Sequence, residues 1–142
     1  MTDGEVHFPD GTVVRGAALA NREVNADWRD RGLYLDARWA PTWPATVLDW
    51  PDLGLPTSDA DAIRAIQEAF THARTGSNVE VGCAGGLGRT GTVLACMAVL
   101  AGVPSTDAVA WIRDRYDRRA VEASRQESWV VSFAQARRRS LG

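Results

Sequence analysis

The sequence predicts a single α/β domain in which a sheet is flanked by helices. Its 142 residues match the length at which a chain normally closes around one hydrophobic core. Short β-prone segments come first, and helical segments with one strand among them follow. That order is typical of a sheet covered by helices. We therefore expect residues 1–142 to form a single domain.

The first half of the chain contains several short strand candidates. They are the segments 6–8, 12–14, 33–36 and 46–48. The first two flank Pro9-Asp10-Gly11, a turn signal that predicts an N-terminal hairpin. The segment 39–44 contains two prolines and is predicted to be a loop, because proline disfavours the interiors of helices and sheets. The polar segment 20–31 is predicted to hold a short helix.

Four helical segments and one more strand are predicted in the second half. The first helix is expected to begin at Ser58 and the third at Ser105, because serine is a favoured N-cap residue. The second helix, 93–100, is apolar on almost every side and is therefore expected to be buried. The fourth helix is predicted to span 126–139, and a short strand, 78–81, precedes the second helix.

The composition excludes several classes of function. The 16 basic residues are all arginine, and the formal net charge is -2, so the basic excess of a nucleic-acid-binding surface is absent. The lack of lysine excludes Schiff-base chemistry and a lysine-dependent nucleotide loop. Two cysteines are too few for a disulfide framework, and no apolar segment is long enough to span a bilayer. We expect a cytoplasmic monomer without membrane or nucleic-acid partners.

The most informative segment is rich in glycine. Residues 82–91 contain five glycines and lie between a predicted strand and a buried helix. In such a position the loop amides and the helix N-terminus converge on one point and favour a bound anion. Glycine also permits the positive φ angles that turn several N–H groups inward. The sequence therefore predicts an oxyanion site in this loop.

Three interpretations of this loop are possible. A nucleotide loop of the type G-x-x-x-x-G-K-[ST] fits the length of 83–90, but Cys83 replaces its first glycine and Arg89 its lysine. A dinucleotide fingerprint fits residues 86–91, although it should open the first βαβ unit and several predicted strands precede it. The third interpretation uses Cys83 and Arg89 together, and it is the one that we favour.

Cys83 and Arg89 form a Cys-x5-Arg-Thr pattern that ends at Thr90. A thiolate at the base of a ring of amides is a nucleophile directed at a bound anion. The helix N-terminus and the amides favour the anionic sulfur, and Thr90 can donate a hydrogen bond to it. The planar guanidinium of Arg89 can bind two phosphate oxygens. The residues expected to hold the phosphate are Ala84, Gly85, Gly86, Leu87, Gly88 and Arg89.

This pattern resembles the signature loop of the cysteine-dependent protein tyrosine phosphatase superfamily. Trp50-Pro51-Asp52 is similar to the mobile Trp-Pro-Asp loop of those enzymes. Its Asp52 lies 31 positions before Cys83. Gln126 stands in a segment that resembles the region supplying a glutamine near the attacking water, although it could equally cap or begin the last helix. The resemblance implies a central mixed sheet flanked by helices, an aspartate that acts as general acid, and a glutamine that orients water.

The resemblance also implies hydrolysis of a phosphoprotein or phosphopeptide through a cysteinyl-phosphate, with no metal and no cofactor. The uncharged residues 84–88 favour a single phosphate, and the Trp-Pro-Asp form resembles phosphotyrosine-directed members more than dual-specificity ones. Asp49 is a competing acid, but its place at a predicted strand end indicates a structural role. Gly82 stands where family members usually carry histidine. This departure leaves open an impaired phosphotyrosine-binding module, and a dual-specificity phosphatase is the other alternative.

Overall fold

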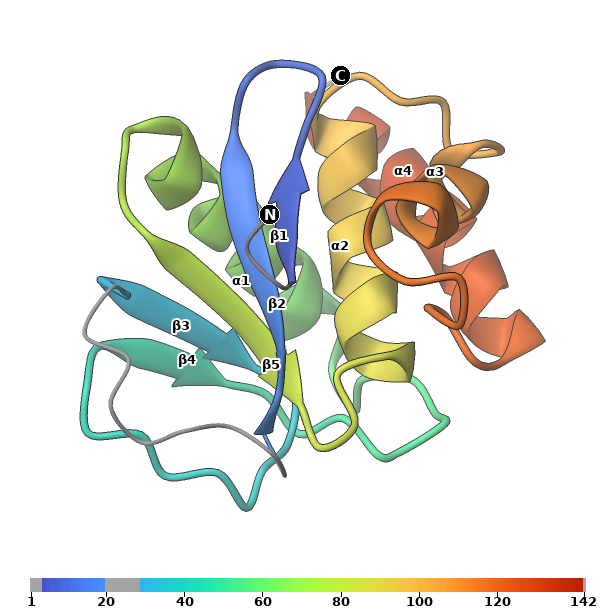
Figure 1. The fold of residues 1–142 in the computed structure, drawn as a ribbon. Coiled ribbons are helices and arrows are strands. Elements are labelled where there is room, and N and C mark those ends of the chain that lie inside the picture. The colour runs from blue at the N-terminus through green and yellow to red at the C-terminus, as the bar shows by residue number, and fades with distance from the viewer. Residues whose placement is uncertain (1–3, 20–28, 142) are drawn as a thin grey trace.

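The computed structural model describes residues 4–19 and 29–141, which form a five-stranded sheet with helices packed against it (Figure 1). The strands are β1 (Glu5–His7), β2 (Val13–Ala18), β3 (Arg31–Tyr34), β4 (Ala45–Val47) and β5 (Val79–Cys83). Their order across the sheet is β1-β2-β5-β3-β4. Only β1 is antiparallel to its neighbour, and the other pairs are parallel. The predicted α/β class with a mixed sheet is confirmed.

The helices are α1 (Asp59–Arg74), α2 (Gly88–Leu100), α3 (Ala108–Arg115) and α4 (Ser124–Leu141). Both α1 and α2 pack on the sheet and on each other, while α3 and α4 pack against α2 (Figure 1). The central place of α2 explains why its residues from Gly88 to Ala98 are buried, as the apolar sequence predicts. None of the described helices combines the length and apolar character needed to cross a membrane.

The parallel strands place the loop between β5 and α2 at one edge of the sheet. Cys83 pairs with Ala18 at the end of β2, and Gly82 pairs with Tyr34 at the end of β3. In parallel sheets, ligands bind outside the carboxyl ends of the strands. The glycine-rich loop therefore lies at the edge where a binding site is expected.

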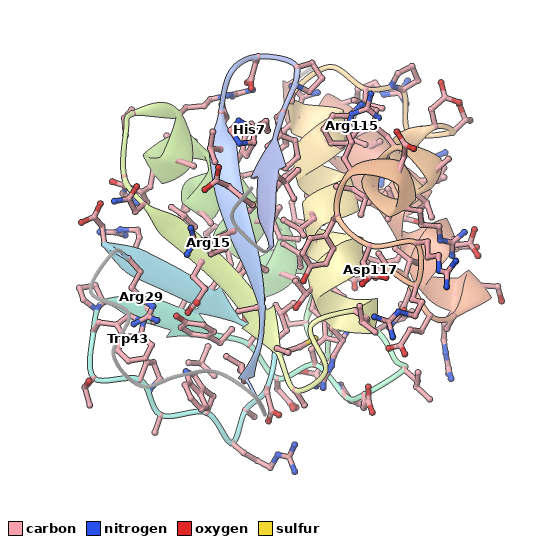
Figure 2. All side chains as sticks on the ribbon, in the orientation of Figure 1. His7, Arg15, Arg29, Trp43, Arg115 and Asp117 are labelled. Carbon is pink, nitrogen blue, oxygen red and sulfur yellow. The ribbon has the colours of Figure 1, made fainter. Side chains whose placement is uncertain are left out.

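The face of the sheet that carries Glu80 is covered by a buried polar cluster. Glu80 is 3% exposed, accepts a hydrogen bond of 2.6 Å from the Tyr34 hydroxyl and pairs with Arg29 at 3.1 Å. The Arg29 guanidinium lies 4.3 Å from the centre of the Trp43 ring (Figure 2). A buried carboxylate requires such partners, because desolvation otherwise disfavours its charge.

Most elements predicted from the sequence are present, with shifted boundaries. The N-terminal hairpin is confirmed, and its turn is closed by a bond of 2.8 Å from the Phe8 amide to the Thr12 carbonyl. The strand predicted over 78–81 continues to Cys83, and those predicted over 33–36 and 46–48 begin earlier. Of the helix predicted over 20–31, residues 20–28 lie outside the described residues, and β3 begins at Arg31.

The two predicted serine caps have different outcomes. Ser58 is confirmed, because its backbone is extended and its Oγ accepts a bond of 3.2 Å from the Asp61 amide. The prediction for Ser105 is wrong. Residues 105–107 form a turn closed by a bond of 2.9 Å from the Asp107 amide to the Pro104 carbonyl, and α3 begins only afterwards. The turn that follows the proline uses the amide that a serine cap would have needed.

These caps provide a matched pair of substitutions. Replacing Ser58 by alanine should lower the free energy of unfolding by about 1 kcal/mol, because the first turn of α1 loses its side-chain acceptor. Replacing Ser105 by alanine should change it by less than about 0.5 kcal/mol, as for ordinary surface positions. Urea denaturation of both variants measures the difference. Equal destabilisation by the two substitutions would contradict the assignment of the caps.

Candidate active site

Cys83 is the last residue of β5, and its side chain lies among the core residues with 2% of its surface exposed. The chain then turns through 84–87 into α2. Gly86 has a φ angle of 70°, a conformation that other residues adopt at a cost. A Cβ at Gly86 would lie 2.8 Å from the Ala18 nitrogen. Both the backbone angle and the close approach to β2 therefore require glycine at this point of the loop.

The backbone of this loop provides a row of unpaired donors. The N–H groups of residues 84–90 donate to no acceptor among the described residues, and Leu87, the N-cap of α2, makes no side-chain capping bond. Unpaired amides at a helix N-terminus carry partial positive charge and bind anions. The predicted phosphate-binding residues thus form one continuous donor set next to Cys83.

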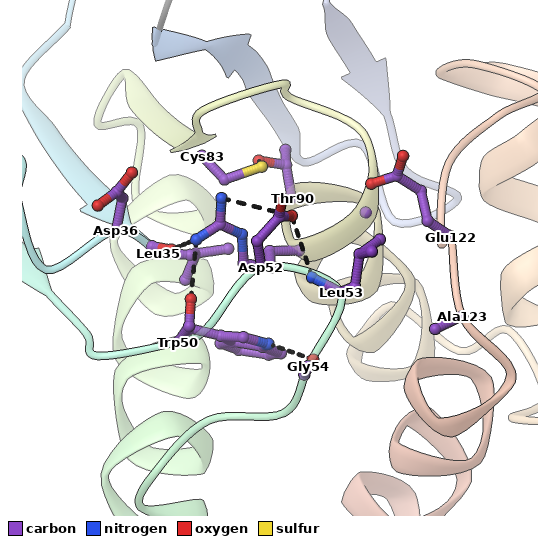
Figure 3. Close-up of polar contacts among 12 residues, drawn as sticks. Leu35, Asp36, Trp50, Asp52, Leu53, Gly54, Cys83, Thr90, Glu122 and Ala123 are labelled. Atoms are coloured by element: carbon purple, nitrogen blue, oxygen red, sulfur yellow. Dashed lines mark hydrogen bonds and ion pairs between the residues drawn. The ribbon is translucent and has the colours of Figure 1, made fainter.

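Arg89 is fixed on one side and open on the other. Its Nη1 donates to the carbonyl oxygens of Leu35 and Trp50, each at 2.8 Å (Figure 3). The side chain is only 5% exposed. Its Nε is buried and has no hydrogen-bond partner among the described residues. A buried donor without an acceptor costs about 1–3 kcal/mol. The edge formed by Nε and Nη2 can bind two oxygens of one anion. The unpaired Nε therefore indicates that an oxyanion is the missing partner.

Thr90 and Cys83 are in direct contact, as the sequence predicts. The Thr90 hydroxyl donates to the Cys83 sulfur at 3.0 Å, and Thr90 is fully buried. The second cysteine has different surroundings. Cys96 is fully buried within α2, and burial raises the pKa of its thiol well above its ordinary value. Of the two cysteines, Cys83 is the one that lies next to the loop donors and whose sulfur accepts a hydrogen bond from Thr90.

The Trp50-Pro51-Asp52 segment is held against Arg89 by the buried Trp50. The Trp50 indole nitrogen donates to the Gly54 carbonyl at 2.8 Å, and the Gly54 amide donates to the Pro51 carbonyl at 3.0 Å. This tight turn leaves the Asp52 side chain 74% exposed, with its Oδ1 atom 3.7 Å from the Nη2 of Arg89 (Figure 3). The structure therefore brings Asp52 close to the Nη2 of Arg89, on the guanidinium edge away from the two carbonyl bonds.

Gln126 is fully buried and connects α4 to the same turn. Its Oε1 accepts bonds from the amides of Glu122 and Ala123, at 3.0 and 3.2 Å. Its Nε2 donates to the Gly54 carbonyl at 3.2 Å. The side chain thus ties the N-terminus of α4 to the Asp52 turn, a contact between residues that are 72 positions apart.

Two residues beside the loop were not singled out as functional by the sequence. The Tyr116 hydroxyl donates to the Gly86 carbonyl at 2.6 Å, and the Glu122 carboxylate lies so close to Gly88 that a Cβ there would clash with its Oε1. No motif in the sequence identifies the acceptor of the Tyr116 hydroxyl. Glu122 does lie within the segment that pointed to Gln126.

The departure at Gly82 has a packing explanation. A Cβ at this position would lie 2.9 Å from the Cδ2 of Leu19 and 3.3 Å from the Cδ1 of Tyr34. A larger side chain at this position would require the end of Leu19 and the Tyr34 ring to shift. The packing of Leu19 and Tyr34 against Gly82 therefore favours glycine at this position.

A pocket of about 340 Å³ adjoins the start of the loop at Ala84. It is lined by Leu19, Asp36, Arg38, Trp39 and Ala84. Hydrogen bonds from Arg38 hold the pKa of Asp36 at about 2, so that this pair is ionic at neutral pH.

The described residues contain no group of three or more His, Cys, Asp or Glu side chains that could hold a metal ion.

Comparison with known proteins gives consistent matches. Residues 51–138 match a family model described as a Swiss Army Knife protein, DSP-PTPase phosphatase domain (PTP-SAK). Two uncharacterized proteins of Methanocaldococcus jannaschii are similar to the chain. One is 33% identical over 117 residues, which cover 74% of this chain and 70% of the relative. The other is 35% identical over 115 residues, which cover 72% and 75%.

Solved structures show the same fold. Kinase-associated phosphatase, with its catalytic-site cysteine replaced by serine, superposes with a TM-score of 0.77 at 14% identity over 96% of this chain and 95% of that one. Tk-PTP in its active form gives a TM-score of 0.73 at 21% identity over 96% and 99%. Together with the family model, these findings show that the chain belongs to the PTP-SAK family of phosphatase domains in the protein tyrosine phosphatase superfamily.

Proposed function

We propose that this phosphatase hydrolyses phosphotyrosine in proteins or peptides through a cysteinyl-phosphate intermediate. The observation that carries the proposal is the set of unpaired donors that begins next to Cys83 in the chain. It consists of the unpaired Nε of Arg89 and the unpaired amides of residues 84–90. A tetrahedral dianion bound there would satisfy these donors and would lie next to the sulfur, which is the geometry that covalent catalysis by a thiolate requires.

In the first step, the Cys83 thiolate attacks phosphorus in line with the tyrosine oxygen. The S–P bond forms, the P–O bond breaks, and Asp52 transfers its proton to the leaving phenolate. The Arg89 edge and the loop amides stabilise the equatorial oxygens, where charge is spread in phosphoryl transfer. The 3.7 Å between Asp52 Oδ1 and Arg89 Nη2 supports this assignment, because Arg89 is the residue that we assign to the phosphate oxygens.

In the second step, the Asp52 carboxylate takes a proton from water, and the resulting hydroxide attacks phosphorus. The S–P bond breaks, which releases inorganic phosphate and returns Cys83 to the thiolate. We assign Gln126 to the orientation of this water, since its amide reaches Gly54 in the turn that carries Asp52. The loop amides remain bound to the phosphate oxygens throughout both steps.

Two alternatives lead to different outcomes. The family description includes dual-specificity phosphatases, so phosphoserine and phosphothreonine are competing substrates. A phosphotyrosine-binding module without activity is the other alternative. It is suggested by Gly82, which replaces the histidine that family members usually carry. The packing of Leu19 and Tyr34 around Gly82 gives the glycine a structural reason, so the missing histidine is not by itself an argument for the binding module. A pure binding module would also have no need of the Cys83 sulfur or of Asp52.

The first prediction concerns the nucleophile. The purified protein should hydrolyse p-nitrophenyl phosphate in the presence of EDTA, and Cys83→Ser should lower kcat by more than about 10³-fold, because the attacking atom is lost. Cys96→Ala is the matched control and should keep kcat, although it lowers the melting temperature. An inert wild type that binds phosphotyrosine peptides tightly would support the binding module. Magnesium-dependent ATP hydrolysis would support the nucleotide interpretation.

The second prediction concerns the acid. Asp52→Asn should lower kcat on phenyl phosphate by about 10²–10⁴-fold, the usual contribution of a positioned acid. The loss on p-nitrophenyl phosphate should be smaller, because p-nitrophenolate leaves more easily without a proton. Asp49→Asn is the control, since Asp49 is exposed and its main-chain carbonyl accepts bonds from Thr57. Equal losses for the two variants, or for the two substrates, would reject Asp52 as the acid.

The third prediction concerns the substrate. In peptides of otherwise identical sequence, phosphotyrosine should be hydrolysed with a kcat/KM at least about 10-fold above phosphoserine and phosphothreonine, a size of discrimination typical of pocket fit. The physical reason is depth: Cys83 is only 2% exposed, and the longer tyrosine side chain reaches further into a recessed site. Equal kcat/KM values for all three peptides would instead establish dual specificity.

A further inference from the structure

Tyr116 holds the peptide bond at the centre of the phosphate loop. Its hydroxyl donates to the Gly86 carbonyl at 2.6 Å, a short distance for a bond between neutral groups. In a planar trans peptide the C=O and the following N–H point in opposite directions. Fixing the Gly86 carbonyl toward Tyr116 therefore directs the Leu87 N–H away from Tyr116. That N–H belongs to the unpaired donors of residues 84–90.

The Tyr116 ring is itself fixed by β2. A Cβ at Gly16 would lie 2.6 Å from both Cε1 and Oη of Tyr116, so the ring packs directly on the glycine backbone. The hydroxyl is also kept as a donor, because burial and then the charge of the Cys83 sulfur raise the pKa of Tyr116. The backbone of Tyr116 is tied to α3 by a bond of 2.7 Å from its amide to the Ile112 carbonyl. Two elements thus position one hydroxyl.

We propose that Tyr116 is a positioning residue for phosphoryl transfer, which acts by holding the Gly86–Leu87 peptide with its N–H directed at a phosphate oxygen. The proposal rests on the proposed function of the Cys83 loop. Interactions that strengthen in the transition state raise the rate, whereas uniform binding does not. Tyr116 should therefore contribute more to the binding of a pentacoordinate phosphorus than to the binding of phosphate. The reason is that an already oriented amide needs no rearrangement when charge develops on the equatorial oxygens.

The test compares two anions on the wild type and on Tyr116→Phe, which keeps the ring on Gly16 and removes only the hydroxyl. Orthovanadate resembles the transition state, and inorganic phosphate is the product. As inhibitors of p-nitrophenyl phosphate hydrolysis, vanadate should bind about 5–10-fold more weakly to the variant, the size of one net hydrogen bond, and phosphate less than about 3-fold more weakly. The kcat value should fall by the same factor as the vanadate affinity.

Tyr34→Phe is the matched control. Tyr34 is the other tyrosine of the chain, and its hydroxyl also makes a buried bond of 2.6 Å, but to Glu80 rather than to the loop. This variant should lose stability without changing the ratio of vanadate to phosphate affinity. Gly16→Ala should reproduce the effect of Tyr116→Phe, because the added methyl displaces the ring. The two losses of vanadate affinity should be non-additive in the double variant, since both act through one hydroxyl.

If Tyr116→Phe retains the wild-type vanadate affinity while both proteins hydrolyse substrate, the role of Tyr116 is rejected and the proposed function stands. If the wild type neither binds vanadate nor hydrolyses substrate, the proposed function fails, and the role of Tyr116 fails with it. Should the variant not fold, tyrosine labelled with ¹³C at Cζ gives a measurement on the wild type. Vanadate should shift one of the two resonances and leave the other in place, and the absence of any shift would overturn the proposal.

Discussion

The attachment of Arg89 to two main-chain carbonyls is the interaction on which the site depends. Arg89 lies at the start of α2, and its Nη1 donates to the carbonyl of Leu35, just beyond β3. The same Nη1 donates to the carbonyl of Trp50, at the start of the turn that carries Asp52. A buried guanidinium is costly unless its donors are paired. The two carbonyls satisfy one end of the group and fix its orientation, and the Nε at the other edge has no hydrogen-bond partner among the described residues. The positive charge of the site is thus held in place by main-chain carbonyls of two segments that follow β3 and β4.

The acid and the charge are coupled through Trp50. The carbonyl of this residue orients Arg89, while its indole and the amide of Gln126 both donate to Gly54. Asp52 is carried by the turn between these two anchors. Its position relative to the guanidinium is therefore determined by buried contacts, although the carboxylate itself is exposed. A change in this turn would affect both the proposed general acid and the orientation of the phosphate-binding charge.

The sequence predicted the local part of the site and missed the tertiary part. The contact between Cys83 and Thr90 could be predicted, because both residues belong to one strand–loop–helix unit whose geometry follows from glycine positions and helix ends. The bond from Gln126 to Gly54 joins distant segments, and the crowding around Gly82 comes from side chains of two other chain segments. Neither leaves a pattern in the sequence. The cap predicted at Ser105 failed for a similar reason, since a turn closed at Pro104 replaced it.

The most direct measurement is a crystal structure of the protein soaked with tungstate, a tetrahedral dianion. The account predicts a tungstate ion beside the Cys83 sulfur, with two oxygens within hydrogen-bond distance of the Nε and Nη2 of Arg89 and the others on amides of residues 84–90. A crystal in which this loop binds no anion, with the Nε of Arg89 bonded to another protein group, would contradict it.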